Sequence, residues 1–431
     1  MTRPDMTRRG FLGRSLIGGC SLAASPFLTP VTFAAAPWDA RLVVIILRGA
    51  MDGLDVVQPW GDPDFVRLRG ADRAGPDTAG GAIDLDGYFA LNPALSGLMP
   101  LWNAGELGFV QAVSTPYRDK RSHFAGQDIL EAGTADSSGI TRSDGWLNRM
   151  LQQVPGISAQ TTYAIGRGDM LLARGAAPVA DWSPEASLGM SAAGLSLMDR
   201  VMHEDPLFRD SLAEAVALSG LGDPDDMESA MAGNGMQGAD SQAMENAMGA
   251  GQSDKTFLKD MAQARRGAGV AEIARFAAQK LAAESRIAAF SLNGWDTHAR
   301  QVQTLRRPLD RLQTVITTLR DELGPVWGKT AVVAMTEFGR TVALNGTGGT
   351  DHGTGGAMVL AGGALRGAKV TGDWPGLSEG ALYQGRDLMP TRDVRDHAAW
   401  IMRGLFGLSR HDLETAVFPG LDMGADPGLI L

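Results

Sequence analysis

Runs of consecutive apolar residues recur along the chain and predict strands that are buried on both faces. The clearest run is RLVVIILRG at 41–49, where no polar side chain interrupts the segment from Leu42 to Leu47. Runs of the same kind lie at 107–114, 162–166, 286–292, 330–336 and 357–363. Their length and their content of Val, Ile, Leu and Ala indicate the central strands of a sheet.

Amphipathic patterns between these runs predict helices. The segment at 304–323 has charged residues on one side and an apolar stripe on the other. The stripe consists of Leu305, Leu309, Leu312, Val315, Ile316 and Leu319. The segment at 269–284 has a similar pattern. Strands that alternate with helices predict an α/β fold, in which a mostly parallel central sheet is flanked by helices on both faces.

The stretch at 220–255 does not fit this alternation. It is acidic and rich in Gly and Met, without a long apolar periodicity. This composition predicts a flexible insertion or lid within the domain. A copper site is an alternative, because thioether sulfur is a soft ligand. Its candidate ligands are Met231, Met236, Met244 and Met248.

Composition and charge limit the classes of molecule that this chain is expected to bind. The chain has 431 residues, of which 44% are hydrophobic and 20% charged, and these fractions are ordinary for a soluble globular protein. The formal net charge is −10. Nucleic-acid binding depends on Lys and Arg that neutralise phosphates, so this charge argues against a nucleic-acid partner.

The first 36 residues predict an export signal. They have a basic start, an apolar middle and the small residues Ala34 to Ala36 at the end. Arg8 and Arg9, followed by Phe11 and Leu12, resemble a twin-arginine signal, and the twin-arginine translocase is therefore an expected partner. Because prolines interrupt the apolar part, we expect no stable membrane span. The predicted mature domain, 37–431, is periplasmic or secreted.

Cys20 is the only cysteine, and it lies inside the predicted signal. The sequence IGGC around it also resembles a lipoprotein box, so a lipid anchor through Cys20 is an alternative. Without that anchor the mature chain has no thiol, which excludes disulfides and thiolate metal sites. Any metal must then be bound by nitrogen and oxygen ligands.

Polar side chains collect at the ends of the predicted strands. Ligands bind at the carboxyl ends of parallel strands, so residues that follow different strands can meet at one edge of the sheet. After the predicted strands come Asp52, Asp55, Arg121, Ser122, His123, Asp296, His298, Glu337 and Arg340, and just before the predicted strand at 357–363 come Asp351 and His352 in a Gly-rich loop. Taken singly, an Asp after a strand is usually a helix cap and a lone His is usually structural. Together, the imidazoles and carboxylates predict a divalent-metal site for zinc, manganese, magnesium or calcium.

Five motifs occur in this order: LRGAMDGLD, RSHF, NGWDTH, TEFGRT and GTDHGTGG. As a set, behind a twin-arginine signal, they resemble the domain-of-unknown-function 1501 family, which is grouped with the alkaline phosphatase and sulfatase superfamily. The resemblance extends from about Leu42 to Gly376. It implies an alkaline phosphatase-like fold, with a large, mostly parallel sheet between helices and a two-metal site at the strand ends.

The resemblance also implies roles for single residues. Asp52, Asp296 and His298 match metal ligands of the superfamily, and Glu337 and His352 fall where further ligands lie. Asp351, beside His352, is added from the residue pattern alone. The usual Asp-His pair is Glu337-Phe338 in this chain, so one His ligand is absent there.

Ser122 lies where the superfamily keeps its nucleophile, although a Ser before a helix is also a typical N-cap. If His123 faces the site instead, it becomes a ligand and the nucleophile is absent. Arg121 or Arg340 would bind the nonbridging oxygens of an anionic group, and a surface ion pair is the alternative for Arg340.

These features predict a metal-dependent hydrolase of phosphate or sulfate esters, acting on a small anionic ester or a polysaccharide. The alternative is a non-catalytic secreted binding or assembly protein that retains the fold. Metal content distinguishes the two, because a mature protein without a divalent ion favours the alternative.

Overall fold

A computed structural model describes residues 38–69, 73–118, 121–135, 144–154, 157, 161–165, 170–182 and 269–431. The predicted signal at 1–36 and the predicted insertion at 220–255 lie outside these residues. Arg8, Arg9 and Cys20 therefore lie outside them as well.

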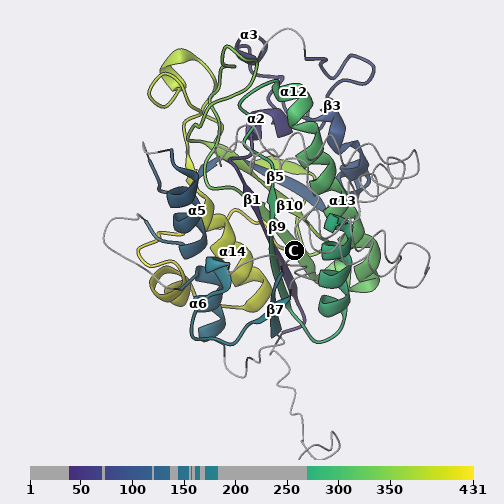
Figure 1. Cartoon of the computed structure of the whole chain (residues 1–431), viewed down its shortest axis with the longest axis vertical. Helices are drawn as coiled ribbons and strands as arrows, with labels where there is room; N and C mark the ends of the chain where they lie inside the picture. Colours follow the sequence, from purple (N-terminus) through teal and green to yellow (C-terminus); the bar gives the residue numbers. More distant parts are fainter. Residues whose placement is uncertain are drawn as a thin grey trace, which may run out of the picture. The chain divides into compact units, whose positions relative to one another are not determined.

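A nine-stranded sheet forms the centre of the described structure (Figure 1). Its main strands are β1 Arg41–Arg48, β5 Leu107–Ser114, β6 Thr162–Ile165, β8 Ile287–Asn293, β9 Thr330–Met335 and β10 Gly356–Ala361. The shorter strands are β7 Ala180–Trp182, β11 Lys369–Thr371 and β12 Arg392–Asp393. The order is β11-β5-β10-β9-β1-β8-β6-β7, and β12 also pairs with β5. Each long apolar run of the sequence therefore forms a strand of this sheet.

The sheet is mostly parallel, with one exception. Strands β9, β1, β8, β6 and β7 pair in parallel, as β11 and β12 do with β5. Strand β10 is antiparallel to both of its neighbours, β9 and β5. The amino end of β10 therefore lies at the edge where β1, β5, β8 and β9 have their carboxyl ends. The α/β fold class predicted from the sequence is confirmed.

The continuous apolar strands are explained by burial on both faces. In β1, Val43, Ile45 and Leu47 belong to one core cluster, while the alternate residues belong to the other. Side chains of a strand point alternately to its two faces, so both faces of β1 need apolar residues. All six residues from Leu42 to Leu47 are at most 1% exposed.

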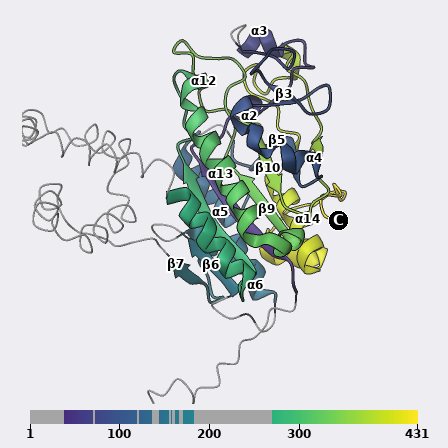
Figure 2. The same cartoon turned by 90° about the vertical axis from the view of Figure 1, so that its right-hand side faces the viewer.

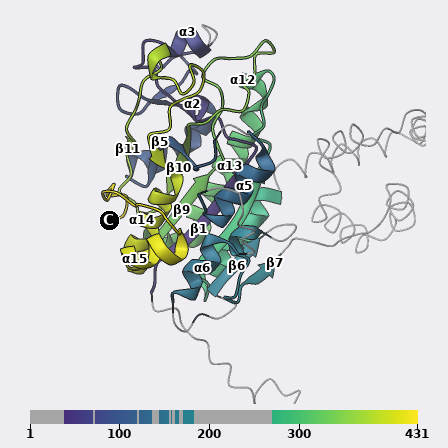
Figure 3. The ribbon, with the colours of Figure 1, turned by 90° about the vertical axis from the view of Figure 1, so that its left-hand side faces the viewer.

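Helices cover both faces of the sheet. One face carries α13 Arg306–Leu323, preceded by α12 Gln301–Thr304, together with the helical residues 269–282 (Figure 2). The other face carries α6 Trp146–Gln152 and α14 Val394–Phe406 (Figure 3). On the same side as α6, α5 His123–Ala132 follows β5.

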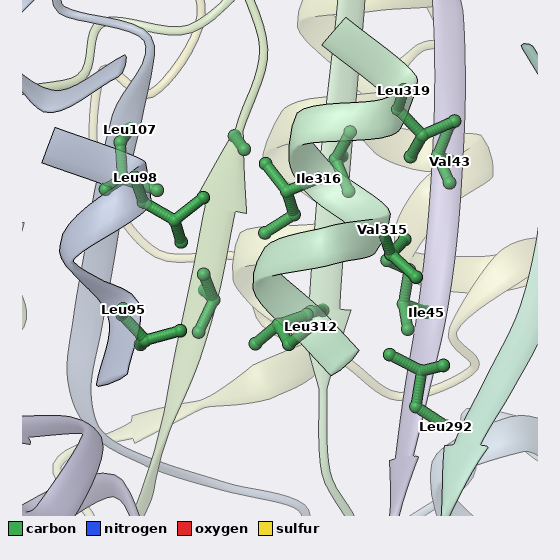
Figure 4. Packing of buried hydrophobic residues seen from close by; sticks show 14 of the residues in the cluster. Val43, Ile45, Leu95, Leu98, Leu107, Leu292, Leu312, Val315, Ile316 and Leu319 are labelled. Carbon is green, nitrogen blue, oxygen red and sulfur yellow. The ribbon is translucent and has the colours of Figure 1, made fainter. Parts of the chain in front are cut away.

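The predicted apolar stripe of α13 packs on the sheet. In Figure 4, Val315 and Leu319 lie against Val43 and Ile45 of β1. On the other side of the helix, Leu312 and Ile316 approach Leu95 and Leu98. Burial of one such side chain stabilises the fold by about 1.5–3 kcal/mol, so this face anchors the helix.

Short elements complete the described structure. The helical ones are α2 Gly53–Val56, α3 Phe65–Arg69, η1 Pro93–Leu98, α4 Met99–Asn103, η3 Leu171–Ala173, η4 Gly324–Lys329, η5 Glu379–Ala381, α15 Arg410–Asp412 and η6 Leu413–Val417. A second sheet has the order β2 Val57–Gln58, β4 Ala90–Leu91 and β3 Ile83–Asp84. Within the described residues, none of the helices combines the length and the apolar character needed to cross a membrane.

Candidate metal centre

Three His side chains and one Asp meet at the edge where β8 ends and β10 begins. Asp296 and His298 follow β8, and His352 precedes β10. His123 is the first residue of α5, which follows β5. The reversed direction of β10 explains why a residue before this strand joins residues that follow the others. The helices α2 and α12, which follow β1 and β8, mark the same end of the sheet in Figure 1.

The three rings direct Nε2 toward one carboxylate oxygen of Asp296. The Nε2–Oδ1 distances are 3.4 Å for His123, 2.9 Å for His298 and 3.2 Å for His352. The Nε2 atoms of His298 and His352 are 3.0 Å apart. Ligand atoms of His123, Asp296 and His352 all lie within 4.8 Å of one another. This spacing is that of a ligand cluster around a common centre.

The opposite nitrogen of each ring has its own oxygen partner. His123 Nδ1 is 2.7 Å from Glu337 Oε1, and His298 Nδ1 is 3.4 Å from Asp351 Oδ1. His352 Nδ1 is 2.8 Å from the carbonyl oxygen of Arg121. A donor at Nδ1 leaves the lone pair at Nε2, so these contacts favour the tautomer in which Nε2 binds a metal.

Glu337 is itself held by several donors. The residue is fully buried, and its Oε1 accepts hydrogen bonds from the Gly49 amide at 3.0 Å and Gln127 Nε2 at 3.1 Å. Thr336 Oγ1 donates to Oε2 at 2.9 Å. Burial would raise the pKa of Glu337, but the hydrogen bonds from His123 and these neighbours lower it. Glu337 is therefore a fixed anion that orients the ring of His123.

Two further charges set the electrostatics of the centre. Arg340 Nη1 donates to Asp296 Oδ1 at 2.8 Å. Burial would raise the pKa of Asp296, but hydrogen bonds from His123, His352 and Arg340 hold it well below its usual range. Without a metal, hydrogen bonds to Asp296 and Glu337 raise the pKa of His123 to about 9. The carboxylates thus stabilise positive charge at this point.

Phe338 packs against the rings of His123 and His352. It is buried and stacks on His123 with the ring centroids 5.2 Å apart and an interplanar angle of 23°. Its ring centroid is 5.4 Å from that of His352. Phe338 therefore provides an apolar surface for the rings of His123 and His352.

Asp52 lies outside the cluster, behind it. Both of its oxygens accept hydrogen bonds from Arg69, at 2.6 and 3.0 Å, and Oδ2 also accepts one from Gln301 at 2.7 Å. Asp55, next to it, pairs with Arg69 and Arg73. Arg69 is fully buried, and its positive charge compensates the negative charge of Asp52. Within the described residues, the side-chain contacts of Asp52 are therefore with Arg69 and Gln301 and not with the three imidazoles.

The remaining predicted residues lie around the centre in different roles. Glu337 contacts Nδ1 of His123, and Asp351 contacts Nδ1 of His298. Both carboxylates therefore lie on the side of the ring opposite to the Nε2 atoms that meet at Asp296. Arg121 has a left-handed backbone, with φ 49°, and its guanidinium is 3.4 Å from the buried Asp387. Ser122 precedes α5 and, within the described residues, makes no side-chain capping hydrogen bond to the helix. Of the two residues left open by the sequence, His123 is the one that contacts the cluster.

The residues present fit a divalent metal. The Nε2 of His123 is buried and lies 3.4 Å from Asp296 Oδ1, which leaves room for a cation between the two atoms. Two imidazole Nε2 atoms at 3.0 Å repel each other unless a proton or a cation lies between them. Three imidazoles with one carboxylate form a donor set that suits zinc better than magnesium or calcium. The candidate ligands are His123, Asp296, His298 and His352.

Sequence reasoning did not find the residues that support this centre. Gln127 contacts Glu337, and Thr350 contacts Arg340 at 3.1 Å. Gln301 and Arg69 contact Asp52. Amide, hydroxyl and guanidinium groups occur throughout the chain, and only Thr350 of these four lies in one of the five motifs, GTDHGTGG, where no role was assigned to it. Only their positions in the fold identify them.

Comparison with known proteins gives one family. The family model described as Protein of unknown function (DUF1501) matches residues 111–397, which include the four candidate ligands. No curated protein matches the sequence.

Solved structures show weak similarity. The lipoteichoic acid synthase LtaP from Listeria monocytogenes has 10% identity and a TM-score of 0.37, covering 90% of this chain and 78% of that chain. The alkaline phosphatase from the Antarctic bacterium TAB5 has 10% identity and a TM-score of 0.27, and the match covers 75% of this chain and 92% of that chain. A magnesium-bound mutant of the TAB5 enzyme has 11% identity and a TM-score of 0.30, and the match covers 76% of this chain and 92% of that chain.

Proposed function

Because the chain belongs to the family of proteins of unknown function DUF1501, whose description assigns no activity, we propose a function from the site itself. The chain is a metal-dependent hydrolase of phosphate or sulfate esters. The observation that carries this proposal is the convergence of three imidazole Nε2 atoms on Asp296 Oδ1, with Nδ1 of each ring bound to an oxygen.

His123, Asp296, His298 and His352 would hold the metal, for which zinc is the best match. A bound divalent cation supplies Lewis-acid stabilisation of negative charge on phosphoryl or sulfuryl oxygens. Arg121, whose side chain is 30% exposed and whose guanidinium is 3.4 Å from Asp387, would pair with an anionic substrate through its remaining N–H groups. Arg340 is fully buried beneath Asp296, so it acts on the ligand and not on the substrate.

Ser122 is kept as the proposed nucleophile even though His123 is the residue that contacts the cluster, because Ser122 directly precedes His123 at the start of α5 and its hydroxyl makes no cap to that helix. Its Oγ would form a bond to phosphorus or sulfur while the bond to the leaving alcohol breaks. The hydroxyl proton would leave to solvent or to the departing alkoxide. Water would then cleave the seryl ester, releasing phosphate or sulfate and restoring Ser122.

Export completes the proposal. Arg8 and Arg9 would direct the chain to the twin-arginine translocase, and the mature domain would act in the periplasm or outside the cell. Its substrate would be a small anionic ester or a polysaccharide that carries such esters.

The alternative is a non-catalytic secreted binding or assembly protein. The burial of Arg340 favours it, because one of the two arginines expected to bind the substrate is engaged with Asp296 instead. In this case the metal would hold the loops together without turnover.

The test is to purify the mature chain, load it with zinc, and measure metal content and hydrolysis of aryl phosphate and aryl sulfate esters. We expect one zinc per chain and ester hydrolysis that His352→Ala removes together with the zinc. Zinc binding without hydrolysis of either ester class would favour the non-catalytic alternative. Absence of bound zinc, manganese and magnesium would contradict the metal centre.

A further inference from the structure

A line of hydrogen bonds connects the buried ion pair of Asp52 with the candidate metal ligand Asp296. Gln301 Nε2 donates to Asp52 Oδ2 at 2.7 Å, and Thr350 Oγ1 donates to Gln301 Oε1 at 3.3 Å. Arg340 Nε then donates to Thr350 Oγ1 at 3.1 Å, and Arg340 Nη1 donates to Asp296 Oδ1 at 2.8 Å. The four residues before Asp296 in this line are at most 1% exposed.

The direction of each bond in this line is fixed by chemistry. Arg340 can only donate, so Thr350 Oγ1 must accept from it and is free to give its own proton to Gln301 Oε1. The amide nitrogen of Gln301 then faces Asp52, whose carboxylate can only accept. At the far end, Arg69 donates to both oxygens of Asp52. No group in the line has to change its role for the other bonds to form.

Asp296 needs such support, because its side chain is 44% exposed. A solvent-exposed carboxylate samples several rotamers unless another group holds it. Arg340 holds it from the buried side, and Thr350 Oγ1 holds the Nε of Arg340. Thr350 itself is fixed by a backbone bond from its amide to the Thr297 carbonyl at 3.1 Å.

We infer that Thr350 and Gln301 are positioning residues of the metal centre, which set metal affinity through Arg340 and Asp296. This inference rests on the proposed function, because it requires the cation to bind at Asp296. Removal of groups that orient a ligand typically lowers metal affinity by about 10–100-fold. Asp52 thereby contributes to the metal site without being a ligand.

The test compares Thr350→Val with Thr350→Ser. Val has nearly the shape of Thr but no hydroxyl, whereas Ser keeps the hydroxyl. The matched control is Thr330→Val, because Thr330 is also fully buried and bonded to one carbonyl, at the opposite end of β9. Zinc affinity of the metal-free mature chain is measured by competition with a chelating dye, and the visible spectrum is recorded with Co²⁺ in place of zinc.

We expect Thr350→Val to lose about 10–100-fold in zinc affinity and to change the Co²⁺ spectrum. Thr350→Ser should stay close to the parent, and Thr330→Val should bind zinc as the parent does even if its melting temperature falls. Gln301→Met, which removes the amide and keeps the length, serves if Thr350→Val does not fold, and the same loss is expected for it.

The outcomes separate this inference from the proposed function. A parent that binds neither zinc nor Co²⁺ contradicts the metal centre and, with it, the positioning role. A parent that binds zinc, with Thr350→Val and Gln301→Met binding it equally well, overturns the positioning role alone. Equal losses in Thr350→Val and Thr330→Val would also overturn it, because the effect would then be one of general stability.

Discussion

At the scale of single residues, the three imidazoles differ in how firmly they are held. His123 contacts a buried carboxylate at 2.7 Å, His352 a backbone carbonyl at 2.8 Å, and His298 the exposed Asp351 at 3.4 Å. A shorter bond to a buried, charged acceptor fixes a ring more strongly than a longer bond to an exposed one. His123 is therefore the most rigid of the three.

This ranking predicts that Glu337→Gln lowers zinc affinity by about 10–100-fold, whereas Asp351→Asn has a smaller effect. The amide of Gln keeps the shape of Glu337 but loses the charge that orients His123. Zinc titration of both variants measures the difference. Glu106→Gln is the control, because Glu106 accepts a bond from Trp327 near the opposite end of the sheet. A larger loss in Asp351→Asn than in Glu337→Gln would reverse the ranking.

Ser122 provides a second prediction at this scale. Its hydroxyl does not cap α5, so Ser122→Ala should change the free energy of unfolding by less than about 0.5 kcal/mol. If Ser122 is the nucleophile, the same change should lower ester hydrolysis by about two orders of magnitude or more.

Ser409→Ala is the comparison for stability, because Ser409 Oγ does accept a capping bond, from the Asp412 amide. That variant should lose about 0.5–2 kcal/mol. Thermal unfolding and an aryl ester assay give both quantities. Full hydrolysis by Ser122→Ala would refute the nucleophile and would favour a direct attack by water.

At the scale of elements, two loops hold the centre together. The loop after β9 pairs with the loop before β10, through a bridge between Arg340 and His352 and through Gly339 and Gly353. The pairing is so close that a Cβ on Gly339 would lie 1.8 Å from the Gly355 carbonyl oxygen. Glycine is required there by the approach of one backbone to another.

Gly339→Ala should therefore destabilise the fold by about 3 kcal/mol and weaken zinc binding, since the loops must separate. Gly346→Ala is the control in the same segment, because a Cβ at Gly346 meets no atom within 4 Å. Urea unfolding and zinc titration compare the two variants. If Gly339→Ala were as stable as Gly346→Ala, close packing of the loops would not be what fixes Arg340 and His352.

The elements also show what a sequence can and cannot predict. Continuous apolar runs such as 41–49 identify buried strands, because a strand covered on both faces has no polar position. The direction of β10 is not encoded in its own residues, since it depends on which strands lie beside it. His352 precedes β10, so it reaches this edge only because β10 is reversed, and the partner of its Nδ1, the Arg121 carbonyl, has no side-chain signal.

Asp52 illustrates the same limit for charged residues. The sequence places it after the first strand, as it does other candidate ligands. Whether such an Asp binds a metal or an Arg depends on Arg69, 17 residues further on, which α3 brings into contact with it. A residue pattern alone does not distinguish these outcomes.

At the scale of the whole molecule, export is predicted to depend on the paired arginines. Arg8→Lys combined with Arg9→Lys should keep the protein in the cytoplasm, because the twin-arginine translocase reads both side chains. Arg14→Lys, in the same basic start, should leave export unchanged. Cell fractionation with an antibody to the mature chain measures both. Normal amounts of the double variant in the periplasm would show that export uses another signal.

The proposed function depends on one metal that binds where the three imidazoles meet Asp296. The most direct measurement is anomalous X-ray diffraction from crystals of the zinc-loaded mature chain, recorded on both sides of the zinc edge. We expect one peak about 2.0–2.2 Å from Nε2 of His123, His298 and His352 and from an oxygen of Asp296. A zinc peak at another place, or no peak in crystals grown with excess zinc, would contradict this metal centre.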